Sequence, residues 1–183
     1  MKQLTQYIQE KLKINSKSKI NHYQYKPKNR KELVEIISKK YQDNKEDLDL
    51  NDIDISNIKD LSYLFELIQP IKVDMNLWNT SHVTDIHGLF WNNTVTKEIH
   101  IENWDVSNVE TAYGAFYFCN KLTELNLDNW DFSSCTEFDL MFKGCENLDT
   151  HFTDNWKMPT HVITADNMFE GCKYKPKWYK GET

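Results

Sequence analysis

Six histidines are the side chains best suited to acid–base chemistry near neutral pH: His22, His82, His87, His100, His151 and His161. An enzyme needs such a group beside a nucleophile or a second acid or base in one pocket. His82 and His161 occupy the same position of a repeated pattern, and the other copies carry asparagine or serine there. Such variation is typical of a surface position. With only five glycines, the chain also has no glycine-rich phosphate loop. We therefore expect no enzyme activity and no cofactor.

Four cysteines offer thiol or metal chemistry: Cys119, Cys135, Cys145 and Cys172. A disulfide and a zinc site are both conceivable, but no Cys-x-x-Cys pair is present. Cys119, Cys145 and Cys172 each lie three residues after a repeated phenylalanine. The pattern favours small buried thiols that fill a repeat position, with no metal bound.

Carboxylates also recur at fixed places, in two groups: Asp54, Asp105 and Asp131, and Glu102, Asp128 and Asp154. A column of carboxylates could bind calcium, which takes six to eight oxygens. Their order is not that of an EF-hand loop. Because aspartate also bonds its own backbone in turns, we predict turn positions rather than an ion site.

All these residues belong to a unit that recurs about every 26 residues. Its most regular member is a phenylalanine, present at Phe65, Phe90, Phe116, Phe142 and Phe169. In each copy, apolar residues stand seven, four and one positions before the phenylalanine. This spacing predicts a short amphipathic helix that ends at the phenylalanine. A hydroxyl residue nine positions earlier is a candidate N-cap: Ser56, Ser81, Ser107, Ser133 and Thr160.

An apolar anchor precedes each predicted cap: Ile53, Trp78, Trp104, Trp130 and Trp156. A repeated tryptophan serves either as a core anchor or as a sugar platform, and the regular spacing favours the core. Trp91 lies off the pattern and is the better candidate for an exposed contact. Before the anchors come alternating, strand-like runs: Leu48-Asp49-Leu50, Met75-Asn76-Leu77, Ile99-His100-Ile101 and Leu125-Asn126-Leu127.

The sequence thus predicts an α/β fold, a leucine-rich-repeat-like solenoid of five strand–turn–short-helix units in residues 48–172. Residues 20–47 contain a predicted helix from Asn29 to about Tyr41 that would cap one end. Residues 173–183, with Trp178 and Tyr179, would cap the other. Residues 1–19 form an amphipathic segment and linker, either a docking segment or an ordinary helix lying on the domain.

The net charge of −6 argues against nonspecific binding of nucleic acid, which depends on Lys and Arg contacts to phosphates. No apolar run is long enough to span a bilayer. The first 14 residues lack the apolar core of a secretory signal. We therefore expect a location in the cytoplasm of a bacterial or phage-infected cell, or in a virion.

Several motifs resemble the BspA-like leucine-rich repeats of bacterial surface proteins: Trp-Asp-Val-Ser-Asn-Val at 104–109, Trp-Asp-Phe-Ser at 130–133 and Met-Phe-Lys-Gly-Cys at 141–145. The resemblance extends over about residues 26–180, and similar short arrays occur in bacteria and their phages. It implies a non-catalytic module that binds other proteins. Two alternatives are a structural protein of a phage virion, docked through residues 1–19, and an adhesin whose export signal is missing.

The predicted binding face follows from the strand-like runs. The residue between two buried ones points outward, and successive copies place these residues side by side. The resulting column is Asp49, Asn76, His100, Asn126 and Phe152, with Glu102 and Glu124 beside it and Trp91 as a separate contact. Phe152 is either an exposed anchor for a protein partner or the sign of a register slip that buries it. We favour the slip, because His151 and Thr153 are poor core residues.

Overall fold

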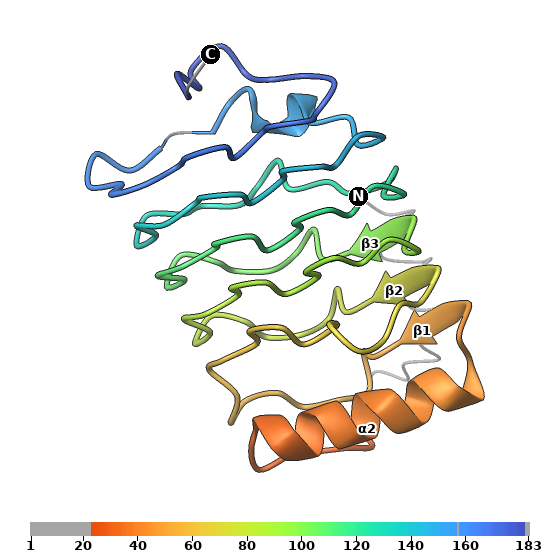
Figure 1. The fold of residues 1–183 in the computed structure, drawn as a ribbon. Coiled ribbons are helices and arrows are strands. Elements are labelled where there is room, and N and C mark those ends of the chain that lie inside the picture. The colour runs from red at the N-terminus through yellow and green to blue at the C-terminus, as the bar shows by residue number, and fades with distance from the viewer. Residues whose placement is uncertain (1–22, 157, 182–183) are drawn as a thin grey trace, which may run out of the picture.

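The computed structural model describes residues 23–156 and 158–181. It contains one α-helix, α2 (Arg30–Asp43), three short strands, β1 (Asp47–Asp49), β2 (Lys72–Asp74) and β3 (Glu98–His100), and a 3-10 helix, η1 (His151–Thr153). The strands are parallel and form an open sheet in the order β1-β2-β3. Beyond α2 the chain winds back and forth in stacked coils (Figure 1). The amphipathic segment predicted for residues 1–19 lies outside the described residues.

The predicted solenoid of five strand–turn–short-helix units is wrong. Within the described ranges only three copies contribute a strand, and each stretch that leads to a repeated phenylalanine is a series of turns rather than a helix. Left-handed backbone explains the difference. The residue two positions before each phenylalanine has a positive φ: Tyr63, Gly88, Gly114, Leu140 and Asn167. A left-handed residue interrupts a right-handed helix.

The backbone of these turns bonds to the neighbouring coil. We call residues 61–65, 86–92, 112–118, 138–144 and 165–171 the ladder segments. The N–H groups of Gly114 and Phe116 donate to the carbonyls of Asp139 (2.8 Å) and Met141 (2.9 Å) in the next coil. The N–H of Ala115, between them, donates to the carbonyl of Ala112, three residues back. Such turns bury the same positions as a helix would, so the apolar spacing alone indicated the wrong element.

The five repeated phenylalanines form one buried column. Phe65, Phe90, Phe116, Phe142 and Phe169 are all fully buried. Their rings stack on one another with centroid separations of 4.4, 5.9, 5.4 and 5.5 Å in chain order. The register of the sequence repeat is therefore correct, although the secondary structure assigned to it was not.

The repeated tryptophans are core anchors, as predicted. Trp104 is 3% exposed, and its indole N–H donates to the carbonyl of Met75 in the preceding coil at 2.9 Å. Trp78, Trp130 and Trp156 are also buried and donate to preceding coils in the same way. Each tryptophan thus fastens one coil to the coil before it.

Aspartates, not hydroxyl caps, organise the turn after each anchor. The Asp105 carboxylate accepts hydrogen bonds from both the backbone N–H and the hydroxyl of Ser107. These two bonds hold the pKa of Asp105 below its ordinary value. Asp54 and Asp131 accept from the N–H of Ser56 and Ser133 in the same way. The predicted N-caps are therefore wrong, and the predicted turn role of these aspartates is confirmed.

The second coil has a different register from the predicted one. Asp49 pairs with Asp74, and Asp74 pairs with His100, so the outward column passes through Asp74 rather than Asn76. Asn76 lies in the turn after β2, where its side-chain oxygen accepts from the N–H of Asn103. Both Val73-Asp74-Met75 and Met75-Asn76-Leu77 alternate in polarity, so the sequence alone did not distinguish them.

Helix α2 covers the first coil, as Figure 1 shows. The side chain of Asn29, where the predicted helix begins, accepts a hydrogen bond from the N–H of Glu32 and so caps the helix. Leu33 and Ile37 are buried against the core. At the other end of the described chain, Trp178 and Tyr179 pack against Phe169. No helix in the described ranges is long and apolar enough to cross a membrane.

All four cysteines are free, and three of them are fully buried. Burial raises the pKa of Cys135 and of Cys172 to about 12, because a thiolate would lose its hydration. The thiols of Cys119 and Cys145 lie 3.2 and 3.0 Å from the carbonyl oxygens of Phe90 and Phe116.

We expect four thiols to react with a thiol reagent immediately after denaturation without reductant, and none to react rapidly in the folded protein at neutral pH. Thiolate is the reactive form, and burial suppresses it. Counting titrated thiols in both states tests this expectation. A count of two in the denatured protein would mean that a disulfide joins two of the four cysteines.

Candidate functional site

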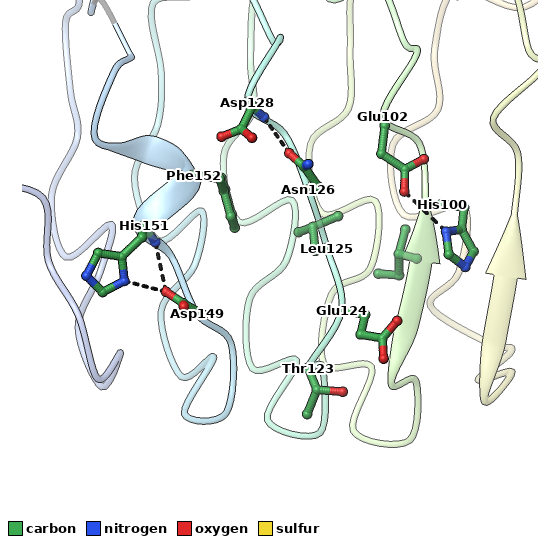
Figure 2. A pocket seen from close by; sticks show the side chains of 11 residues that line it. His100, Glu102, Thr123, Glu124, Leu125, Asn126, Asp128, Asp149, His151 and Phe152 are labelled. Atoms are coloured by element: carbon green, nitrogen blue, oxygen red, sulfur yellow. Dashed lines mark hydrogen bonds and ion pairs between the residues drawn. The ribbon is translucent and has the colours of Figure 1, made fainter. Parts of the chain in front are cut away.

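A cavity of about 570 Å³ opens on the side of the coils that carries the strands. We call it the strand-face cavity. It spans three consecutive coils, from β3 to η1, and its lining is shown in Figure 2: Ile99, His100, Glu102, Thr123, Glu124, Leu125, Asn126, Asp128, Asp149, His151 and Phe152. The buried side chains of Ile99 and Leu125 contribute the apolar part of the lining, and the polar side chains surround it.

Parallel pairing of the coils positions the polar side chains. His100 ends β3, and an isolated bridge between Glu98 and Glu124 continues the pairing into the next coil. Asn126 therefore follows His100 along the outward column. The side-chain oxygen of Asn126 accepts from the N–H of Asp128 at 2.9 Å, which fixes the turn beside the cavity.

His100 is held between two carboxylates. Its Nδ1 lies 3.2 Å from Glu102 Oε1, and its Nε2 lies 3.8 Å from Glu98 Oε2. Glu98 in turn lies 3.5 Å from the ammonium group of Lys72 on β2. His100 Nε2 and Glu102 Oε2 are buried without a hydrogen-bond partner in the part of the chain that the structure describes. This edge of the cavity is thus a row of charged groups on adjacent coils.

The other edge contains a second histidine–carboxylate pair. Asp149 accepts hydrogen bonds from the ring and the backbone N–H of His151. These bonds hold the pKa of Asp149 below its ordinary value. The His151 ring stacks on Tyr174 with a centroid separation of 3.5 Å. The C-terminal segment therefore fixes the orientation of this pair.

Five of the eight predicted binding residues come together at this cavity: His100, Asn126, Phe152, Glu102 and Glu124. The other three predicted residues lie outside the cavity lining. Asp49 lies on β1, Asn76 lies in the turn after β2 because of the register difference, and Trp91 lies on a ladder segment. Phe152 is half-buried in η1, and its ring packs against Phe142 and Trp156. Phe152 is thus neither freely exposed nor fully buried, and the neighbouring Thr153, which was expected to be a poor core residue, is fully buried.

Sequence reasoning missed four lining residues: Thr123, Asp128, Asp149 and His151. Asp128 was assigned to a turn, and its position two residues after Asn126 was the available signal. Asp149 and His151 enter the cavity because the fifth copy forms η1 instead of a strand. The available signal was that His151 and Thr153 are poor core residues, which marked this copy as irregular without indicating a 3-10 helix.

The lining is suited to attracting positive charge. Four of its members are carboxylates, Glu102, Glu124, Asp128 and Asp149, and none is lysine or arginine. Thr123 carries the one hydroxyl of the lining, and its hydroxyl donates to the carbonyl of Lys97 rather than to a histidine. Among the described residues, no group of three or more histidines, cysteines or carboxylates is arranged to hold a metal ion.

One family model matches this chain: it is described as "Mycoplasma protein of unknown function, DUF285" and matches residues 59–178. No curated protein and no solved structure matches. The matched range begins just before the first ladder segment and ends at Trp178. It includes every residue that lines the strand-face cavity.

Proposed function

The chain belongs to the DUF285 family, and we propose that it is a non-catalytic protein-binding module whose strand-face cavity accepts a basic segment of another protein. The observation that carries this proposal is the lining, with four carboxylates, an apolar floor and no lysine or arginine. Complementary charge steers association and fixes register between proteins. The same negative charge disfavours nucleic acid as the partner.

The resemblance of residues 104–109 and 141–145 to motifs of BspA-like proteins also supports protein binding, since proteins of that kind bind other proteins.

The rigidity of the cavity is a second support. Backbone bonds such as that from the N–H of Ile99 to the carbonyl of Glu124 hold its coils together. Phe152 and His151 are fixed by Trp156 and Tyr174. A pre-organised site loses little conformational entropy on binding.

Neutralising the cavity should weaken binding of a basic partner. Glu124 and Asp128 are both exposed, and neither forms a salt bridge with another described residue. The double variant Glu124→Gln with Asp128→Asn therefore removes two charges at little structural cost. The wild-type chain is used to capture proteins from the native host. Each captured protein is identified, purified and titrated against the wild-type chain and against the double variant. We expect the double variant to bind about 5–10-fold more weakly, and wild-type binding to fall as salt is raised.

The matched control is Asp47→Asn with Glu146→Gln, which removes two exposed charges outside the cavity lining. His100→Ala and Asn126→Ala then test the outward column itself, and the melting temperature of each variant reports on folding. Equal affinity of the cavity variant and the control pair for every captured protein would contradict the proposal.

A further inference from the structure

Six aromatic side chains form a second surface, on the ladder segments and away from the strand-face cavity: Tyr63, His87, Trp91, Tyr113, Tyr117 and Phe118. We call it the aromatic ladder surface. None of the six is fully buried. The shortest contact is between Trp91 and Tyr117, whose stacked rings lie 4.1 Å apart, and Trp91 also contacts Tyr63 and Tyr113. The contacts join three consecutive coils.

Glycines in the ladder make room for these rings. An added Cβ on Gly114 would lie 2.4 Å from Trp91 Cζ3, and one on Gly88 would lie 2.4 Å from Tyr63 Cε1. Both rings therefore lie directly over the backbone of the next coil. Since one face of each ring packs on this backbone, and Trp91 also stacks on Tyr117, the edges of the rings are the part left for a ligand.

The Tyr63 hydroxyl bonds to the ring of His87 at 2.7 Å, but three other polar groups of this surface lack acceptors among the described residues. The indole N–H groups of the other five tryptophans each donate to a backbone carbonyl. That of Trp91 has no acceptor among the described residues, and the same holds for the hydroxyls of Tyr113 and Tyr117. A buried indole or phenol normally finds a partner, and one facing outward is typical of binding surfaces.

Negative charge borders one end of this surface. Asp85 accepts a hydrogen bond from the N–H of His87, and Glu66 follows the first ladder segment. Burial raises the pKa of Tyr63, and the neighbouring Tyr113, Glu66 and Asp85 raise it further. The N–H of Glu66 donates to the carbonyl of Tyr63 at 3.3 Å, and Asp85 accepts from the N–H of His87, whose ring bonds to the Tyr63 hydroxyl. Both carboxylates therefore belong to residues beside this end of the surface.

We propose that the aromatic ladder surface binds a proline-rich segment in the polyproline II conformation, with a basic residue of that segment near Glu66 and Asp85. Proline has no N–H, so such a segment offers carbonyl acceptors, which match the donors of Trp91, Tyr113 and Tyr117. Polyproline segments dock on aromatic surfaces because they are already extended and lose little entropy. The basic residue complements the two carboxylates.

The dimensions agree with this ligand. Coils joined by backbone hydrogen bonds lie about 4.8 Å apart, as strands do. A polyproline II helix rises about 3.1 Å per residue, or about 9.3 Å per three-residue turn. One turn therefore spans about two coil spacings, so equivalent prolines meet side chains of alternate coils.

The test uses a fluorescein-labelled peptide of two arginines followed by eight prolines, titrated with the full chain by fluorescence anisotropy. A matched peptide replaces the prolines with alternating glycine and serine and keeps both arginines. We expect the proline peptide to bind at least about tenfold more tightly. Equal binding of the two peptides would mean recognition by charge alone and would overturn the proposal.

Variants assign the binding to this surface. Trp91→Ala should weaken binding at least about tenfold, as the loss of an aromatic hot spot does. Tyr117→Phe keeps the ring and removes one donor, so a loss of about 2–10-fold is expected with an unchanged melting temperature. Ile163→Ala, an exposed apolar residue elsewhere, should have no effect. Unchanged affinity in both Trp91→Ala and Tyr117→Phe overturns the proposal. Absence of peptide binding also overturns it, whether or not the chain binds maltohexaose, which is the probe for a carbohydrate ligand.

Discussion

Replacing Phe116 with alanine is expected to lower the free energy of unfolding by about 3–5 kcal/mol, because it leaves a cavity in the middle of the phenylalanine column. Phe116 is fully buried, and its ring stacks between Phe90 and Phe142 at 5.9 and 5.4 Å. It also contacts Trp130. Neighbours on both sides limit how far the coils can collapse into the space. Urea denaturation followed by circular dichroism measures the change.

Phe118→Ala is the matched control, since the same change is made two residues along the same ladder segment. Phe118 is 36% exposed, and its N–H bond to the carbonyl of Lys143 does not depend on the side chain. We expect a loss of about 1 kcal/mol or less. Similar losses for the two variants would mean that the buried column does not dominate the stability of this region.

Gly114→Ala is expected to cost about 1–3 kcal/mol from the backbone alone, because Gly114 has a φ of +54°. The added Cβ would also lie 2.4 Å from Trp91 Cζ3, so the indole must move. We therefore expect a loss of stability together with a change in tryptophan fluorescence. Both are measured in one urea titration.

Two comparisons separate the backbone strain from the clash. Gly171 has a φ of +80°, but an added Cβ there would come no closer than 3.4 Å to another atom, so Gly171→Ala adds strain without a clash. Combining Gly114→Ala with Trp91→Ala removes the ring that clashes. We expect the double variant to lose less stability than the sum of the two single variants. Strict additivity would show that the indole does not lie over Gly114 in solution.

Residue spacing was sufficient to predict the buried columns of phenylalanines and tryptophans. The phenylalanines and tryptophans are in the core because apolar side chains at a fixed period must share one side of every coil. The helix that begins at Arg30 was predicted for a local reason, the hydrogen bond between Asn29 and Glu32. The aspartate turns were predicted for a local reason too, since each carboxylate bonds a residue two positions away.

The backbone form of the repeat was not predictable from spacing. Turns closed by bonds such as that from the N–H of Ala115 to the carbonyl of Ala112 bury the same positions as a helix. The choice between them depends on acceptors about 26 residues away, such as the Met141 carbonyl that binds the N–H of Phe116. Each coil therefore keeps its ladder conformation because the next coil satisfies its backbone.

The candidate site, too, was predictable from the sequence only in part. The sequence by itself determined the period, the buried columns and most of the outward column, because these depend on polarity at fixed intervals along the chain. Only the tertiary structure decided that Asp74 replaces Asn76 in that column, and that η1 brings Asp149 and His151 to the cavity. It also decided that Trp91 lies over Gly114. These outcomes depend on the register between coils, which is fixed by hydrogen bonds and packing between segments far apart in the sequence.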